Sequence, residues 1–121
     1  MTWQIDALSN RDREALGSLV GRLMAEPSLR VQRIVLYGSK ARHEDTPESD
    51  IDVLVVTADD RWLLKDRIST IGARVALDYD VLFSLMVVSQ ARWDWMQHIR
   101  HPFYRSVAVD GIDITAVREL A

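Results

Sequence analysis

The residues best suited to chemistry lie between Leu36 and Val56 (LYGSKARHEDTPESDIDVLVV). Asp50 and Asp52 introduce an apolar run, and because side chains alternate along a strand, both carboxylates should point the same way, about 6–7 Å apart. Two carboxylates on one face can share a hard cation. Mg²⁺ prefers oxygen ligands and usually keeps positions for water and substrate phosphates. The pair therefore predicts a magnesium site.

A Gly-Ser pair precedes the two aspartates and is suited to binding a phosphate. Gly38 has no Cβ, so the backbone there can approach a phosphate closely. Ser39 offers a hydroxyl and should begin a short helix, where free backbone N–H groups attract anions. Lys40 and Arg42 follow as candidate phosphate neighbours, although either can also be a solvated surface charge. Gly-Ser after a strand is, by itself, most often only a turn.

A third carboxylate is expected from the segment LDYDVLF. Asp78 and Asp80 share one face of a predicted strand there. A carboxylate on the buried side of a strand is costly unless it is paired or binds a metal. Asp80 lies deeper in the predicted strand, so it is the first choice for a third metal ligand, whereas Asp78 can equally well end the preceding helix.

Hydrophobic periodicity predicts the elements that must position these residues. Strands are expected at 31–37, 51–57 and 79–88, helices at 9–26, 60–77, 89–100 and 102–110, one helical turn at 39–42, and a short extended piece at 112–114. The loop between the first two strands is too short for a crossover helix, so these strands should be antiparallel neighbours. The expected fold class is α/β (α+β), with helices packed on a small mixed sheet.

Bulk composition limits the function classes. A length of 121 residues and a hydrophobic share of 48% suit one domain spanning 1–121. A net charge of -3 argues against a general nucleic-acid binder. The absence of cysteine excludes disulfides and thiolate metal sites and favours a cytoplasmic protein. No apolar run has the length of a membrane span, and the N-terminus lacks the features of a signal peptide.

Gly38-Ser39, followed after ten residues by Asp50-x-Asp52, resembles the signature of the DNA polymerase β-like nucleotidyltransferase superfamily. The strings GSKAR…SDIDVLVV, YDVLF and PFYRSVAVDGIDI are similar to its minimal nucleotidyltransferase (MNT) branch. His43 departs from the pattern, since members commonly have Gly there, but it touches no proposed metal ligand. The resemblance implies a polymerase β-like nucleotidyltransferase fold.

The same resemblance implies roles for individual residues. Asp50 and Asp52 would hold two Mg²⁺ ions, and Asp80 would complete one metal site and help to deprotonate the acceptor hydroxyl. Gly38 and Ser39 would bind the triphosphate of ATP or another NTP. A hydroxyl would attack the α-phosphate and pyrophosphate would leave, a reaction that paired metals favour because they stabilise both the attacking and the leaving oxygen.

The resemblance also implies a partner. MNT proteins are often paired with HEPN-domain proteins in prokaryotic toxin–antitoxin modules, so this chain would be an antitoxin that transfers AMP to a HEPN toxin, in a homo- or hetero-oligomer.

Trp93 and Trp95 lie about 200° apart on a helix, so they cannot both face inward. The partner is expected to bind on exposed apolar surface near Trp93, Trp95, Phe103 and Tyr104. Two alternatives stay open: a non-catalytic module that neutralises a partner by contact, and transfer to a small molecule of the aminoglycoside type.

Overall fold

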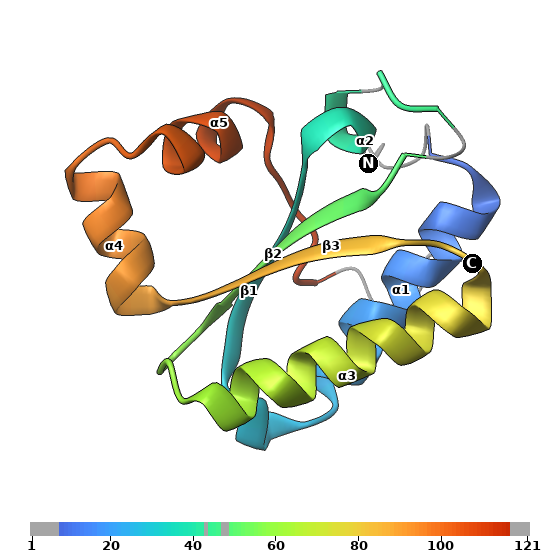
Figure 1. The fold of residues 1–121 in the computed structure, drawn as a ribbon, viewed down its shortest axis with the longest axis horizontal. Coiled ribbons are helices and arrows are strands. Elements are labelled where there is room, and N and C mark those ends of the chain that lie inside the picture. Colours follow the sequence, from blue (N-terminus) through green and yellow to red (C-terminus); the bar gives the residue numbers. More distant parts are fainter. Residues whose placement is uncertain (1–7, 43, 47–48, 117–121) are drawn as a thin grey trace.

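The computed structural model describes residues 8–42, 44–46 and 49–116. The elements in chain order are α1 (Asn10–Met24), η2 (Pro27–Leu29), β1 (Val31–Tyr37), α2 (Gly38–Arg42), β2 (Ile51–Thr57), α3 (Trp62–Tyr79), β3 (Phe83–Ser89), α4 (Gln90–His98), α5 (Pro102–Asp110) and β4 (Ile112–Asp113). The strands form one sheet in the order β3-β2-β1-β4 (Figure 1). Strand β1 is antiparallel to β2 and β4, whereas β3 is parallel to β2. The predicted mixed sheet and the antiparallel pairing of the first two strands are confirmed.

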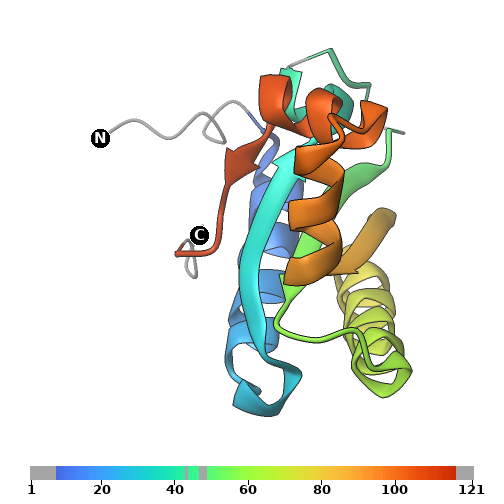
Figure 2. The same ribbon diagram turned by 90° about the vertical axis from the view of Figure 1, so that its left-hand side faces the viewer.

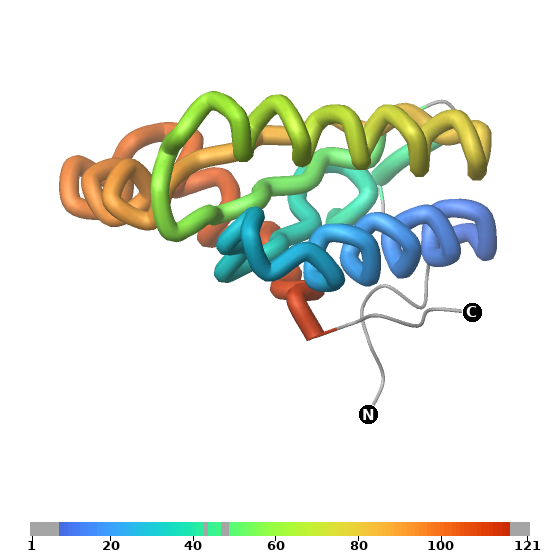
Figure 3. The backbone as a smooth tube through the Cα atoms, turned by 90° about the horizontal axis from the view of Figure 1, so that it is seen from below, coloured from blue at the N-terminus to red at the C-terminus, as the bar shows by residue number. Residues whose placement is uncertain are grey.

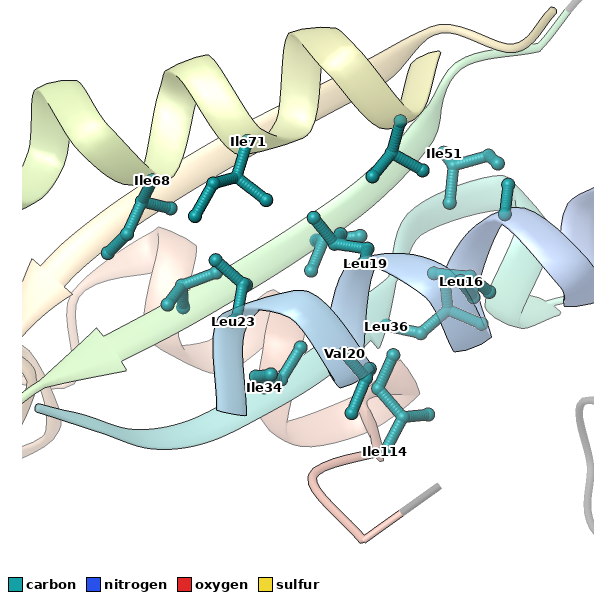
Figure 4. Close-up of a cluster of buried hydrophobic side chains, with 14 of the residues drawn as sticks. Leu16, Leu19, Val20, Leu23, Ile34, Leu36, Ile51, Ile68, Ile71 and Ile114 are labelled. Carbon is teal, nitrogen blue, oxygen red and sulfur yellow. The ribbon is translucent and has the colours of Figure 1, made fainter. Parts of the chain in front are cut away.

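Helix α1 begins where its sequence supplies a cap. Ser9 Oγ accepts a hydrogen bond from the backbone N–H of Asp12 at 3.1 Å, which satisfies one of the free amides of the first turn. The apolar stripe of the helix then packs against the sheet (Figure 4). Its fully buried members are Leu16, Leu19, Val20 and Leu23. Burial of this stripe fixes the helix on the sheet more firmly than helix propensity alone.

Helices cover both faces of the sheet. Helices α1 and α3 lie side by side on one face (Figure 3) and enclose the larger core. Helices α4 and α5 cover the other face toward one end of the sheet (Figures 1 and 2), where Leu54, Val56 and Val88 pack against Trp93 and Met96. Because side chains alternate along β2, Asp52 shares the face of Leu54 and Val56.

The region before β3 differs from the sequence prediction. Helix α3 extends to Tyr79, and Asp80 caps it in the left-handed conformation with φ 55°, its N–H donating to Ala76 O. The N–H of Val81 bonds to the same carbonyl at 3.1 Å. A left-handed residue that satisfies the last carbonyls is a common way to end a helix. The prediction that a strand begins at 79 is therefore wrong, and the strand starts at Phe83.

The aromatic residues of α4 and α5 settle a second expectation. Trp93 is 4% exposed and Trp95 is 50% exposed, which confirms that only one of them faces inward. The Trp93 ring packs against Phe103 and Tyr104 at centroid distances of 6.3 and 5.3 Å. Trp93 therefore belongs to the second core, with Phe103 and Tyr104 partly buried against it, whereas Trp95 on the same helix is exposed. The expected partner surface near these residues stays a prediction. None of the helices described is long and apolar enough to cross a bilayer.

Candidate active site

Asp52 lies in the middle of the candidate site. On β2 it is paired with Tyr37 of β1 on one side and with Ser84 of β3 on the other. The pKa of Asp52 is raised by burial and next by the negative charge of Asp50, while a hydrogen bond from Ser84 and the charge of Arg42 act in the opposite direction. A half-buried carboxylate beside a second carboxylate favours a cation, because a cation would relieve both the burial and the repulsion.

Gly38 brings the end of β1 against Asp52. It joins β1 to α2 with φ +77°, a conformation that side chains disfavour. A Cβ at this position would lie 2.2 Å from Asp52 Oδ2 and 3.0 Å from its Cγ. Only glycine allows this approach, and Ser39 follows immediately as the second residue of α2. The structure therefore places the predicted Gly-Ser pair beside the predicted carboxylate pair.

Tyr37 is a site residue that the sequence prediction missed. Burial raises the pKa of its phenol, and the negative charge of Asp52 raises it further. The ring packs edge-on against Phe103 at 5.4 Å, which fixes its orientation. The phenol therefore stays protonated at neutral pH beside the carboxylate. The antiparallel register could have identified Tyr37, because the residue before Gly38 must lie opposite the start of the second strand.

The third carboxylate does not lie where it was expected. On β3 the neighbour of Asp52 is Ser84. Asp80 is instead the α3 cap, with a 98% exposed side chain 3.8 Å from Arg11. Asp78 lies within α3 and forms an ion pair with Arg22 at 2.9 Å. The placement of Asp80 on a buried strand face is therefore wrong, because the chain there turns out of a helix.

Lys40 is buried and bound to carboxylates of the protein itself. Its ammonium lies 2.7 Å from Asp12 of α1 and 3.0 Å from Asp45, and it donates to Thr46 O at 3.3 Å. Burial by itself would lower its pKa, but hydrogen bonds and the charges of the two carboxylates raise the pKa above the ordinary value. Lys40 is thus a positive charge that holds α1, α2 and the following loop together, rather than a free phosphate neighbour.

Arg42 keeps its place at the edge of the site. Its guanidinium donates to Glu44 at 2.6 Å and to Asp110 of α5 at 3.1 Å. Its charge also lowers the pKa of Asp52. The side chain is 41% exposed, so it can reach an anion without crossing the core.

The donor set limits what the site can bind. Within the described residues, no group of three His, Cys, Asp or Glu side chains is placed to hold a metal ion. Asp50 and Asp52 nevertheless fit Mg²⁺, which is commonly held by one or two carboxylates with substrate phosphates and water as the other ligands. The repulsion between the two carboxylates supports this fit.

Comparison with known proteins gives concordant results. The family model described as "Nucleotidyltransferase domain" matches residues 20–110. "Putative protein adenylyltransferase MJ0604" of Methanocaldococcus jannaschii is 30% identical over 100 residues, which cover 83% of this chain and 94% of that protein. "Putative protein adenylyltransferase MJ0141" of the same organism is 37% identical over 59 residues, or 48% of this chain and 60% of that protein.

Two solved structures are also similar. A "putative nucleotidyltransferase from Sulfolobus solfataricus" aligns with a TM-score of 0.57 and 15% identity, covering 94% of this chain and 88% of its own, which shows a shared fold. A "toxin-antitoxin with AMP-PNP" aligns more distantly, with a TM-score of 0.44 and 24% identity over 88% of this chain and 73% of that chain.

Proposed function

The chain belongs to the nucleotidyltransferase domain family and is an enzyme of that class, and from this premise we propose that it transfers AMP from ATP to a hydroxyl group of a partner protein. The observation that carries the proposal is the contact between the two motifs. Gly38 lies so close to Asp52 that a phosphate bound at the glycine backbone would lie beside the carboxylate. The name of the relative that matches most of this chain supports AMP as the transferred group and a protein as acceptor.

We assign the roles at the site from the contacts. Asp50 and Asp52 would hold Mg²⁺, which when bound supplies the charge that stabilises attacking and leaving oxygens. The backbone at Gly38 and the hydroxyl of Ser39 would contact the triphosphate. Arg42 would counter the negative charge of the nucleotide from the edge of the site. An acceptor hydroxyl would attack the α-phosphorus, and the bond to pyrophosphate would break.

The identity of the acceptor protein and the surface that binds it are a separate part of the proposal. The sequence resemblance implies a HEPN-domain toxin, which AMP transfer would inactivate. Exposed apolar side chains on α4 and at its C-cap offer a place for such a partner, since Trp95 is 50% and Ile99 46% exposed. We propose that they contact the acceptor protein while its hydroxyl enters the site.

A binding module is the second candidate, and one observation favours it. Beside Asp52, β3 presents the neutral hydroxyl of Ser84 where a further carboxylate would strengthen a metal site. A protein with a weakened site could still neutralise its partner by contact. This candidate predicts inhibition that ends when the two proteins separate.

Co-expression with the partner tests the two candidates. The partner is produced with the wild type and with a variant that carries both Asp50→Asn and Asp52→Asn, and its intact mass is measured after separation. We expect the partner to gain the mass of AMP only with the wild type, on a Tyr, Ser or Thr hydroxyl, because these side chains can act as nucleophiles. A partner that both versions neutralise without a change in mass would establish the binding module instead.

A further inference from the structure

The two edges of the sheet differ in their protection. Strand β4 forms one edge and has only two residues, whereas β3 forms the other with seven. Natural proteins protect exposed edges by charged side chains, proline, bulges or short strands. The segment 81–89 (VLFSLMVVS) contains no charged residue and no proline, and it pairs with β2 in continuous register. The β3 edge therefore lacks the usual protection against pairing with another strand.

The register on β2 shows which backbone groups face outward. The N–H of Ile51 donates to Leu82 O at 2.8 Å. Alternate residues of a strand direct their backbone groups to the same neighbour, so the N–H and C=O groups of Phe83, Leu85 and Val87 point away from β2. No other strand of the described residues pairs with them.

The surface beside this edge is open and apolar. Small side chains of α3 line a groove of about 630 Å³ along β3. Its lining includes Ser69, Gly72, Ala73 and Ala76. Leu77 and Leu82 at one end of the groove are 80% and 66% exposed. Such a groove gives space to the side chains of a strand and helix added at the β3 edge.

We propose that a second copy of this chain pairs with this edge, antiparallel about a two-fold axis at Leu85, and joins the two four-stranded sheets. The outward groups are symmetric about that residue. Leu85 would pair with its own copy, and Phe83 with Val87 of the copy, so that every outward N–H and C=O finds a partner. A two-fold interface must be self-complementary in this way.

Charge and helix surfaces agree with the same axis. Exposed Asp80 lies just before the strand and exposed Arg92 lies just after it, so antiparallel pairing brings opposite charges together. On α3, Trp62 and Leu77 lie within about 60° of each other around the helix but at opposite ends. They are 71% and 80% exposed, and the two-fold axis would place each beside the other on the neighbouring copy.

The proposed pairing is argued from the β3 edge and does not depend on the proposed function. Light scattering coupled to gel filtration measures the oligomeric state over a range of concentrations. We expect a dimer for the wild type. Leu77→Lys and Met86→Lys should each weaken it roughly tenfold or more, because each would bury an uncompensated charge at the interface. Val109→Lys is the matched control, since Val109 lies on α5 and is 82% exposed.

The register has its own test, because the chain contains no cysteine. Ser84 and Met86 of the copy would be directly opposite with Cα atoms about 4.5 Å apart, within reach of a disulfide. The variant Ser84→Cys with Met86→Cys should therefore form a covalent dimer on oxidation, and far more completely than Met86→Cys alone. Circular dichroism checks that each variant is folded. If Leu77→Lys or Met86→Lys does not fold, Leu82→Lys takes its place as the lysine variant of the edge.

Three outcomes would overturn the inference. The wild type could remain a monomer up to its solubility limit, or form a dimer that resists every lysine variant of the edge. The β3 amides could also be protected from hydrogen exchange only after a different protein is added, which would assign the edge to that partner instead.

Discussion

Gly38 and Asp52 are in such close contact that a single methyl group on the glycine would lie 2.2 Å from a carboxylate oxygen. Gly38→Ala should therefore displace the carboxylate, and its left-handed backbone should cost about 1–2 kcal/mol of stability in addition. We expect nucleotide affinity and turnover to fall together. Calorimetry with Mg²⁺ and ATP and a thermal melt measure the two effects. Gly21→Ala within α1 is the control, and an equal loss of binding there would contradict a local cause.

Asp52→Asn should remove activity while it stabilises the fold. Electrostatic stabilisation by a metal site contributes several kcal/mol to the transition state, so we expect turnover to fall at least about a hundredfold. A carboxyl whose pKa is higher in the folded than in the unfolded chain destabilises the fold once it ionises, and this cost appears as pH rises above its ordinary value of 3.8. Denaturant melts should show the variant more stable than wild type at pH 7 but not at pH 3.

Metal and nucleotide should bind together. Asp50 and Asp52 repel a bare triphosphate, so ATP should bind appreciably only with Mg²⁺ or Mn²⁺. Calorimetry with metal, and again in EDTA, measures the difference. Equal affinity for ATP in both buffers would rule out the two aspartates as the metal site.

Lys40→Met should destabilise the protein without a direct effect on the nucleotide. It leaves Asp12 and Asp45 without their shared cation, and removing one partner of a buried ion pair costs about 3–5 kcal/mol. Lys65→Met on α3 is the matched control and should change stability by less than about 0.5 kcal/mol. Below its melting temperature, Lys40→Met should bind Mg-ATP as the wild type does. A selective loss of affinity would restore Lys40 as a phosphate ligand.

Asp80→Asn should leave transfer unchanged within about twofold, as expected of an exposed helix cap outside the site. Under the same assay, Asp52→Asn should be inactive. A variant of Asp80 that is as inactive as that of Asp52 would show that Asp80 moves into the site when substrate binds, and would reinstate it as the third carboxylate.

The sequence alone determined the local parts of this protein. Buried strands, amphipathic helices and the Ser9 cap follow from side-chain periodicity and short-range hydrogen bonding, which act within a few residues. The Gly-Ser and Asp-x-Asp motifs could be predicted to meet, because a short loop forces the two strands into an antiparallel pair.

Only the tertiary structure decided which side chains meet across elements far apart in the chain. The residue of β3 that pairs with Asp52 depends on where α3 ends. Because Asp80 ends that helix in the left-handed conformation, β3 begins later than the sequence predicts, and Ser84 rather than an aspartate pairs with Asp52. Lys40 is of a residue type that often binds phosphate. Packing of α1 places Asp12 against its ammonium, so Lys40 is a buried structural charge instead. The residue type gives each side chain its charge, negative for a carboxylate and positive for an ammonium, at any position in the sequence. Its role depends on burial and on the nearest opposite charge, and the fold determines burial and neighbour alike.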